Sequence, residues 1–212
     1  KQEMLTISAD EVKPYFNIDS VIVNGVFYAA HRVYGLSFVE RKDVPTYHPD
    51  MKVFEVRDKN GKMLALFYSD PYRRPTKRGG AWMSAFAKQS NLRKQLPIIY
   101  NVTNYAKAPE GQPTLITWDE VTTLFHEFGH ALHGMLSNCY YNTLSGTAVA
   151  RDFVEMPSQF NESFASIPEI FDHYAKHAVT GEPMPAELKE KMLQSISFQQ
   201  ASALGENLAA TC

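Results

Sequence analysis

The pattern of hydrophobic and polar positions divides the chain into three parts. The first part runs up to Gly35 and has a helical pattern. Ser8, followed three residues later by Glu11, is a helix-start signal, and Gly35 is a stop signal after the segment "DSVIVNGVFYAAHRVYG". These signals predict helices over most of this part.

The second part consists of short runs rich in Val, Phe, Leu and Tyr, at residues 37–43, 52–58, 63–70 and 97–105. Such runs, bounded by turn residues, are typical of strands. The turn "DKNGK" joins the second run to the third, so these two are predicted to form a hairpin. The loop "KAPEGQP" follows the fourth run.

From Thr117 onward the pattern is helical again, with breaks around "SGTAVARD", at Pro168 and at "TGEPMP". Helices, a small mixed sheet and then more helices indicate an α+β fold. The last segment, residues 188–212, reads as a long helix without a stop signal at its end. We therefore expect residues 1–212 to be a single partial domain, cut from a longer protein.

Composition narrows the classes of function. The chain of 212 residues is 44% apolar and 21% charged, as in ordinary globular proteins, and its net charge of −2 gives no reason to expect nucleic acid or a membrane as a partner. The apolar runs are too short and interrupted to span a bilayer, and no leader opens the chain. Cys139 and Cys212 make no disulfide framework, which favours a reducing compartment. We expect a cytoplasmic monomer with an inert thiol at Cys139, and the periplasm is the alternative location.

The segment "RRPTKRGGAWM" lies between the third and fourth strand runs. Its clustered basic residues allow a phosphate-binding interpretation, but its two glycines lack the spacing of a nucleotide-binding loop. We favour a solvated loop that leads into an edge strand at "GGAWM". An edge strand can accept a peptide by backbone pairing.

The helix that begins after Thr117 has a clear start signal. Thr117 can act as the N-cap, Glu120 completes a capping box, and Ile116 and Val121 are placed to form a hydrophobic staple. These residues predict a helix over 118–136, which includes the stretch "TLFHEFGHALHGM".

On this helix His126 and His130 lie on one face, about 6 Å apart along the axis, because they are four residues apart. Two imidazoles in this arrangement can share one tetrahedral zinc ion. Glu127 lies about 100° round the helix and so beside the metal, where a carboxylate can take a proton from water and pass it to a leaving amine. This HExxH pattern predicts a hydrolytic metal site, and an ordinary polar helix face is the alternative.

His133 lies on the same face but about 10 Å from His126, too far for both to bind one ion. We predict that it lies near the site or in the cleft wall. The metzincin continuation would require Gly at position 133 and His at position 136, where this chain has His133 and Leu136. A third ligand must therefore come from elsewhere in the chain.

The segment "RDFVEMPSQFNESFA" offers candidates for that third ligand. Glu155 opens a second predicted helix, and Gln159 and Glu162 follow on the same face. One of these can be a ligand, and the others, or Asp152, can orient the histidines by accepting their distal N–H bonds. The alternative is an exposed acidic helix face. Two imidazoles and one carboxylate leave an open position for water, and this donor set favours zinc.

Four segments together resemble the thimet-oligopeptidase family of zinc peptidases: "LFHEFGHALHGMLS", "LSGTAVARDFVEMPSQFNE", "RPTKRGGAWM" and "IIYNV". The last two favour the bacterial peptidyl-dipeptidase branch. The resemblance implies a zincin-like core with the sheet next to the HExxH helix, one zinc ion per chain held by His126, His130 and Glu155, and Glu127 as general base. It also implies a substrate channel that admits short unfolded peptides.

The expected activity is zinc-dependent hydrolysis of oligopeptides with release of C-terminal dipeptides. An endo-acting oligopeptidase of the same family is the closest alternative. In this family a His and Tyr residues beyond the third ligand stabilise the oxyanion, and we match none of them to this chain. A zinc-binding module without activity, because it is a fragment, and a peptide-binding helical domain are therefore alternatives from other classes.

Overall fold

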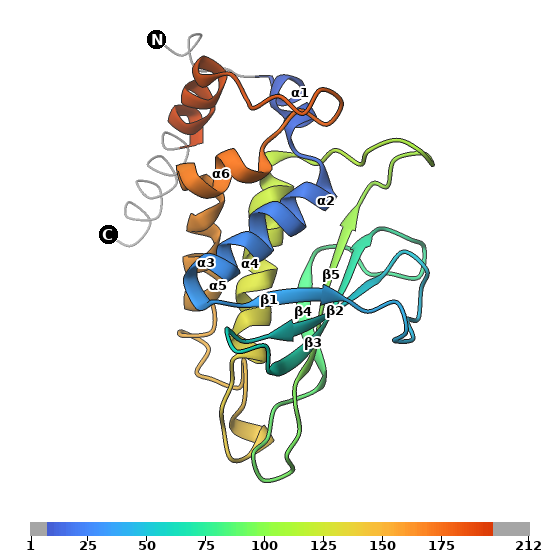
Figure 1. Cartoon of the computed structure of the whole chain (residues 1–212), viewed down its shortest axis with the longest axis vertical. Coiled ribbons are helices and arrows are strands. Elements are labelled where there is room, and N and C mark those ends of the chain that lie inside the picture. The colour runs from blue at the N-terminus through green and yellow to red at the C-terminus, as the bar shows by residue number, and fades with distance from the viewer. Residues whose placement is uncertain (1–7, 197–212) are drawn as a thin grey trace, which may run out of the picture.

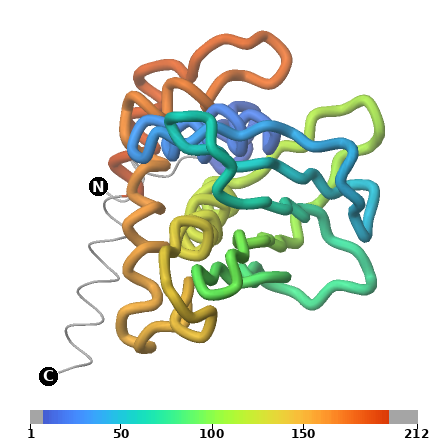
Figure 2. Tube along the Cα trace, turned by 60° about the horizontal axis from the view of Figure 1, so that its bottom comes forward, coloured from blue at the N-terminus to red at the C-terminus, as the bar shows by residue number. Residues whose placement is uncertain are grey.

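The computed structural model describes residues 8–196 of the chain. Helices lie on one side of a five-stranded sheet, and the long helix α4 lies between the sheet and the other helices (Figure 1). Figure 2 shows the same order from a second direction, with α4 in the middle, α5 on one side of it and the strands on the other. The predicted α+β fold, with the sheet next to the HExxH helix, is confirmed.

The helical elements are α1 (Ala9–Val12), η1 (Lys13–Tyr15), α2 (Ile18–Ser20), η2 (Val21–Phe27), α3 (Tyr28–Tyr34), α4 (Trp118–Met135), η3 (Asn142–Leu144), α5 (Met156–Glu162), η4 (Ser163–Ser166) and α6 (Pro168–Tyr174). The strands are β1 (Ser37–Glu40), β2 (Lys52–Arg57), β3 (Met63–Tyr72), β4 (Trp82–Ala87) and β5 (Ile98–Tyr105). Residues 186–196 are also helical, and the rest of the helix predicted for 188–212 lies outside the described residues.

The predicted end signals of the first part are confirmed. Ser8 is the N-cap of α1 and accepts a hydrogen bond from the backbone N–H of Asp10. The α2–η2–α3 segment runs continuously to Gly35, which adopts a left-handed conformation with φ of 69°. Glycine occupies such a position at no steric cost, so it ends the helix here. Within residues 8–196, no helix has the length and apolar character that a membrane crossing requires.

The strands are arranged in the order β1-β2-β3-β5-β4, in which only the β3–β5 pair is parallel. The hairpin predicted between β2 and β3 is confirmed, because the backbone N–H of Asp58 donates to the carbonyl of Lys62 at 2.9 Å. The edge strand predicted at "GGAWM" is β4, which begins at Trp82 and lies at one edge of the sheet. One side of β4 is therefore without a partner strand among the described residues.

Helix α4 begins as predicted and packs against the inner face of the sheet. The Thr117 side chain accepts from the Glu120 N–H, and the Glu120 carboxylate accepts from the Thr117 N–H at 2.8 Å, which completes the capping box. Further along, the buried Phe128 ring meets Phe67 of β3 with ring centres 5.2 Å apart. A Cβ added at Gly134 would lie only 2.8 Å from the Met83 Cε atom of β4, so the edge strand lies close against this helix.

A buried carboxylate marks the opposite face of the sheet. Phe67 points toward α4, and Asp70, three residues later on β3, points to the other face. Asp70 is only 1% exposed. It accepts two hydrogen bonds from Arg74 at 2.7 Å, one from the Tyr47 hydroxyl at 2.9 Å, and lies 2.8 Å from the Lys77 ammonium group. Two cations of the chain itself therefore neutralise this carboxylate, and a phenol also donates a hydrogen bond to it.

This cluster corrects the prediction of a solvated loop at "RRPTKRGGAWM". The Lys77 side chain is only 4% exposed and also donates to the backbone carbonyls of Tyr72 and Thr103. Arg73 and Arg78 of the same segment are exposed, as predicted. The sequence interpretation failed for Lys77 because charge density alone does not show which cation has a buried carboxylate nearby.

Candidate metal centre

Helix α4 places His126 and His130 side by side on one face. Their ring centres are 4.9 Å apart and the ring planes are nearly perpendicular, at 83°. Both side chains are mostly buried, with exposed fractions of 25% and 12%. The regular helix between them fixes this separation, as the four-residue spacing predicts.

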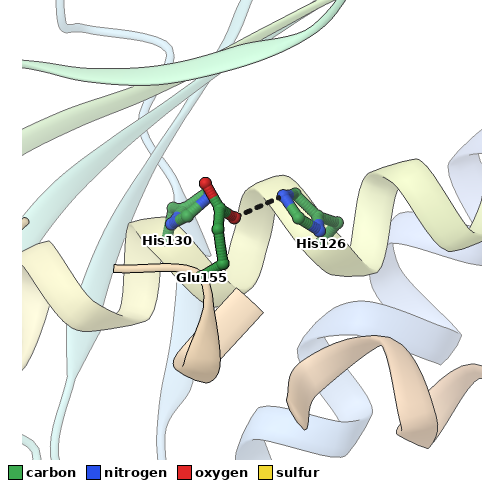
Figure 3. A group of neighbouring side chains, drawn as sticks. All are labelled: His126, His130 and Glu155. Carbon is green, nitrogen blue, oxygen red and sulfur yellow. Dashed lines mark ion pairs between the residues drawn. The ribbon is translucent and has the colours of Figure 1, made fainter. Parts of the chain in front are cut away.

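Glu155 approaches both rings from the first turn of α5. Its Oε2 atom lies 3.3 Å from the Nε2 of His126 and 3.1 Å from the Nε2 of His130. Figure 3 shows the three side chains pointing toward one another, two from α4 and one from the start of α5. The three candidate donor atoms lie within 4.8 Å of one another.

These separations fit a small tetrahedral cation. Ligand atoms at about 2.0–2.2 Å from such an ion are roughly 3.3–3.6 Å from each other. The two distances between oxygen and nitrogen are already close to that range, and imidazole with carboxylate is a donor set typical of zinc. The structure therefore brings together the three residues predicted as ligands in a group that can hold a metal ion.

Glu162, at the end of α5, contacts the other side of one candidate ligand. Its Oε1 atom makes a short hydrogen bond with the Nδ1 of His126. A carboxylate at this position favours the proton on Nδ1 and leaves the lone pair on Nε2, toward Glu155. The Nδ1 of His130, in contrast, is buried and has no hydrogen-bond partner within residues 8–196.

The other two residues predicted to orient the histidines do not do so. Asp152 and Gln159 are exposed, and their side chains make no hydrogen bond within the described part of the chain. Glu162 occupies the last turn of α5, where its side chain reaches His126, and Gln159 points away to solvent. The prediction therefore holds for Glu162 alone.

Glu127 lies beside the group, as the helix geometry predicts. The residue is 7% exposed, and it is not among the three residues of the candidate metal group. Burial raises the pKa of Glu127, while His126 acts in the opposite direction and Glu155 raises the pKa further. A carboxyl group with a raised pKa is better suited to take up and return a proton near neutral pH.

His133 also lies where its spacing predicts, outside the three-residue group. It lines a cavity of roughly 610 Å³ together with residues of α4, α5 and the loop between them. Its ring packs edge-on to Phe153 with ring centres 6.3 Å apart. His133 is therefore part of a wall near the site.

The sequence interpretation did not identify three residues that bring α5 against α4. A Cβ added at Gly129 would lie 2.6 Å from the Ser158 Cα, so only glycine permits this approach. The buried Asn161 side chain donates to the carbonyl of Phe125 at 2.6 Å, and Ser158 donates to Glu155. The glycine was a signal, because a glycine inside a helix costs about 1 kcal/mol relative to alanine and often marks close packing.

An HExxH helix against a small mixed sheet, with a carboxylate from the start of α5 facing both histidines, is the core of a zincin-type metallopeptidase. The chain belongs to Peptidase family M3, whose family profile matches residues 1–211. The family predicted from the sequence motifs is thereby confirmed, and peptides are the class of substrate of this family.

Similar proteins agree with this assignment. The dipeptidyl carboxypeptidases of Salmonella typhimurium and Escherichia coli are each 49% identical to the chain over 210 residues, which is 99% of the chain and 31% of those proteins. Oligopeptidase A of Escherichia coli is 44% identical over 207 residues, which is 95% of the chain and 30% of that protein. The chain thus spans about a third of the length of these relatives.

Proposed function

We propose that this chain carries the catalytic core of a zinc-dependent peptidyl-dipeptidase, an enzyme that releases dipeptides from the C-termini of oligopeptides. The observation that supports the chemistry most strongly is the convergence of His126, His130 and Glu155 on one point beside the buried Glu127. The identity of 49% to two dipeptidyl carboxypeptidases supports the exo-acting branch. Because the chain spans 31% of those relatives, we propose the activity for the longer protein to which this core corresponds.

In this proposal one zinc ion per chain is held by His126, His130 and Glu155. A bound zinc ion supplies Lewis acidity, which polarises a peptide carbonyl and makes water more acidic. Glu127 accepts the proton of the attacking water and passes it to the amine that leaves. The short hydrogen bond that the Nδ1–H of His126 donates to Glu162 favours the tautomer of His126 that metal binding requires.

The edge of β4 gives a place for the peptide backbone. It is the outermost strand of the sheet and lies against α4 near Gly134, a turn beyond His130. An extended peptide can form backbone hydrogen bonds with such an edge strand, as the sequence predicts for the strand at "GGAWM". The proposed substrate therefore lies along β4 and across the face of α4 that carries the histidines.

An endo-acting oligopeptidase is the second candidate, because oligopeptidase A is nearly as similar to the chain, at 44% identity. A zinc-binding module without activity is the candidate from another class. For the remaining properties we propose a single partial domain over residues 1–212, a monomer, and a cytoplasmic location, for which the small number of cysteines is the support.

The test combines metal analysis with a peptide digest read by mass spectrometry. The purified longer protein that contains this core is loaded with zinc, and its Glu127→Gln variant, which keeps all three proposed ligands, is the matched control. We expect about one zinc ion in both proteins, and cleavage only in the wild type, with products shortened by two residues from the C-terminus. Internal cuts would favour the oligopeptidase. Zinc binding without cleavage beyond that of the variant would favour the inactive module, and no zinc binding would contradict the metal site.

A further inference from the structure

The third proposed ligand stands in an exposed position that does not fix it by itself. Glu155 is the N-cap residue of α5, makes no capping hydrogen bond with its side chain, and has a side chain that is 51% exposed. A glutamate side chain that is free to rotate loses rotamer entropy when it is held in one conformation. Some contact must therefore hold this carboxylate between the two imidazoles.

Ser158 makes that contact. Its hydroxyl group lies 2.9 Å from the Oε2 of Glu155 and also 2.9 Å from the backbone carbonyl of the same residue. The Oε2 atom is the one that faces His126 and His130. Ser158 itself is completely buried, with 0% exposure, so water does not compete for its hydroxyl group.

The position of Ser158 is in turn fixed relative to the histidines. The backbone of Ser158 lies against Gly129, which is the residue directly before His130. Asn161, one turn later, is tied to the carbonyl of Phe125, which directly precedes His126. The backbone of α4 thus determines where Ser158 lies, and the Ser158 hydroxyl determines where the Glu155 carboxylate lies.

We propose that Ser158 is a positioning residue that holds the Glu155 carboxylate in place for metal binding. This inference rests on the proposed function, because it takes Glu155 as a ligand. Residues that orient metal ligands by a hydrogen bond typically change metal affinity 10- to 100-fold when they are replaced. Ser158 is such a residue, because its hydroxyl group donates to the Oε2 atom of Glu155.

The test compares two serines that make the same local contact. Ser163 also donates to the backbone carbonyl three residues before it, that of Phe160 at 2.6 Å, but within residues 8–196 its hydroxyl makes no hydrogen bond with a carboxylate. Ser158→Ala and Ser163→Ala therefore both remove a backbone contact of a helix, and only the first removes the contact with Glu155. Zinc affinity is measured by competition with a chromogenic chelator, and the cobalt(II)-loaded proteins are compared by visible absorption.

We expect Ser158→Ala to bind zinc about 10- to 100-fold more weakly than the wild type and to show an altered cobalt spectrum. Ser163→Ala is expected to match the wild type in both measurements. Equal affinity and equal spectra in wild type and Ser158→Ala would overturn the inference, and so would equal weakening by both substitutions. Thermal unfolding of the metal-free proteins controls for folding. If the wild type binds no zinc, the proposed function fails, and this result is distinct from every outcome above.

Discussion

Two carboxylates of this chain lie in polar clusters of opposite kind. Asp70 is 1% exposed, is paired with the cations Arg74 and Lys77, and accepts a hydrogen bond from the Tyr47 hydroxyl. The Glu155 side chain is 51% exposed, and its Oε2 atom faces two imidazoles whose charge depends on protonation. One cluster is complete within the chain, and the other is suited to a cation from outside it.

The difference separates a structural role from a functional one. A buried carboxylate with its own cations stabilises the fold only as long as every partner is present, since an unpaired buried charge is costly. A carboxylate that faces two imidazoles at ligand distances can instead contribute through a bound metal ion. We therefore expect substitutions in the Asp70 cluster to change stability but not metal affinity, and substitutions in the Glu155 cluster to do the reverse.

The largest effect is expected for Asp70→Asn. The substitution keeps the size of the side chain and removes the negative charge, which leaves Arg74 and Lys77 unpaired beneath the loop. Breaking a buried pair in this way typically costs about 3–5 kcal/mol of unfolding free energy. Urea denaturation of the metal-free protein measures it. Zinc affinity of the folded variant is expected to equal that of the wild type, and a stability change under about 1 kcal/mol would contradict the role given to Asp70.

For Glu155→Gln we expect a change in zinc affinity and little change in stability. It removes one of three proposed ligands, so zinc affinity is expected to fall roughly a hundredfold or more, because the binding free energy of a zinc site is distributed over few ligands. The unfolding free energy of the metal-free variant is expected to stay within about 0.5 kcal/mol of the wild type, since the side chain is half exposed. Removal of zinc by a chelator should lower the melting temperature of the wild type and leave that of the variant unchanged.

A smaller effect is expected for Glu162→Gln. The amide still fits beside the Nδ1 of His126 but no longer provides the charge that polarises this ring. Loss of such an orienting carboxylate is expected to weaken zinc binding about 10- to 100-fold. Gln159→Glu is the matched control, because position 159 lies on the same short helix but is exposed and makes no side-chain contact with the histidines. A change of zinc affinity in the control as large as that in Glu162→Gln would show that general charge near the site is responsible.

Much of the Glu155 cluster could be predicted from sequence, and the reason is helix geometry. The capping box at Thr117 starts α4 where it was expected, and regular spacing then determines the positions of His126, Glu127 and His130 relative to one another. The approach of Glu155 could not be derived in this way, since it depends on how two helices pack. For that residue the sequence left alternatives open, and the family resemblance selected among them.

The Asp70 cluster was missed because only part of it is local: Arg74 and Lys77 follow Asp70 by four and seven residues, but the other partners come from distant segments. Tyr47 lies in the loop before β2, with that strand and a hairpin turn between it and β3, and the carbonyl of Thr103 that binds Lys77 belongs to β5. No local spacing rule joins these positions. The basic segment around Arg74 was visible in the sequence, but whether its cations faced water or a buried carboxylate depended on the sheet order β3-β5-β4.

The smallest expected effect is the loss, at acid pH, of the stabilisation that the Asp70 carboxylate provides. Burial alone would raise the pKa of Asp70, but the hydrogen bonds from Arg74, Lys77 and Tyr47 outweigh burial and lower it. A lowered pKa in the folded state means that the stabilisation from Asp70 is present above the unfolded-state pKa of about 3.9 and is lost as the pH falls below it. In metal-free protein, the difference in unfolding free energy between wild type and Asp70→Asn is therefore expected to be constant from pH 7 to about pH 5 and to shrink below about pH 4. Urea denaturation at each pH measures this difference, and a gap that stays the same down to about pH 2 would mean that the carboxylate charge is not what stabilises the cluster.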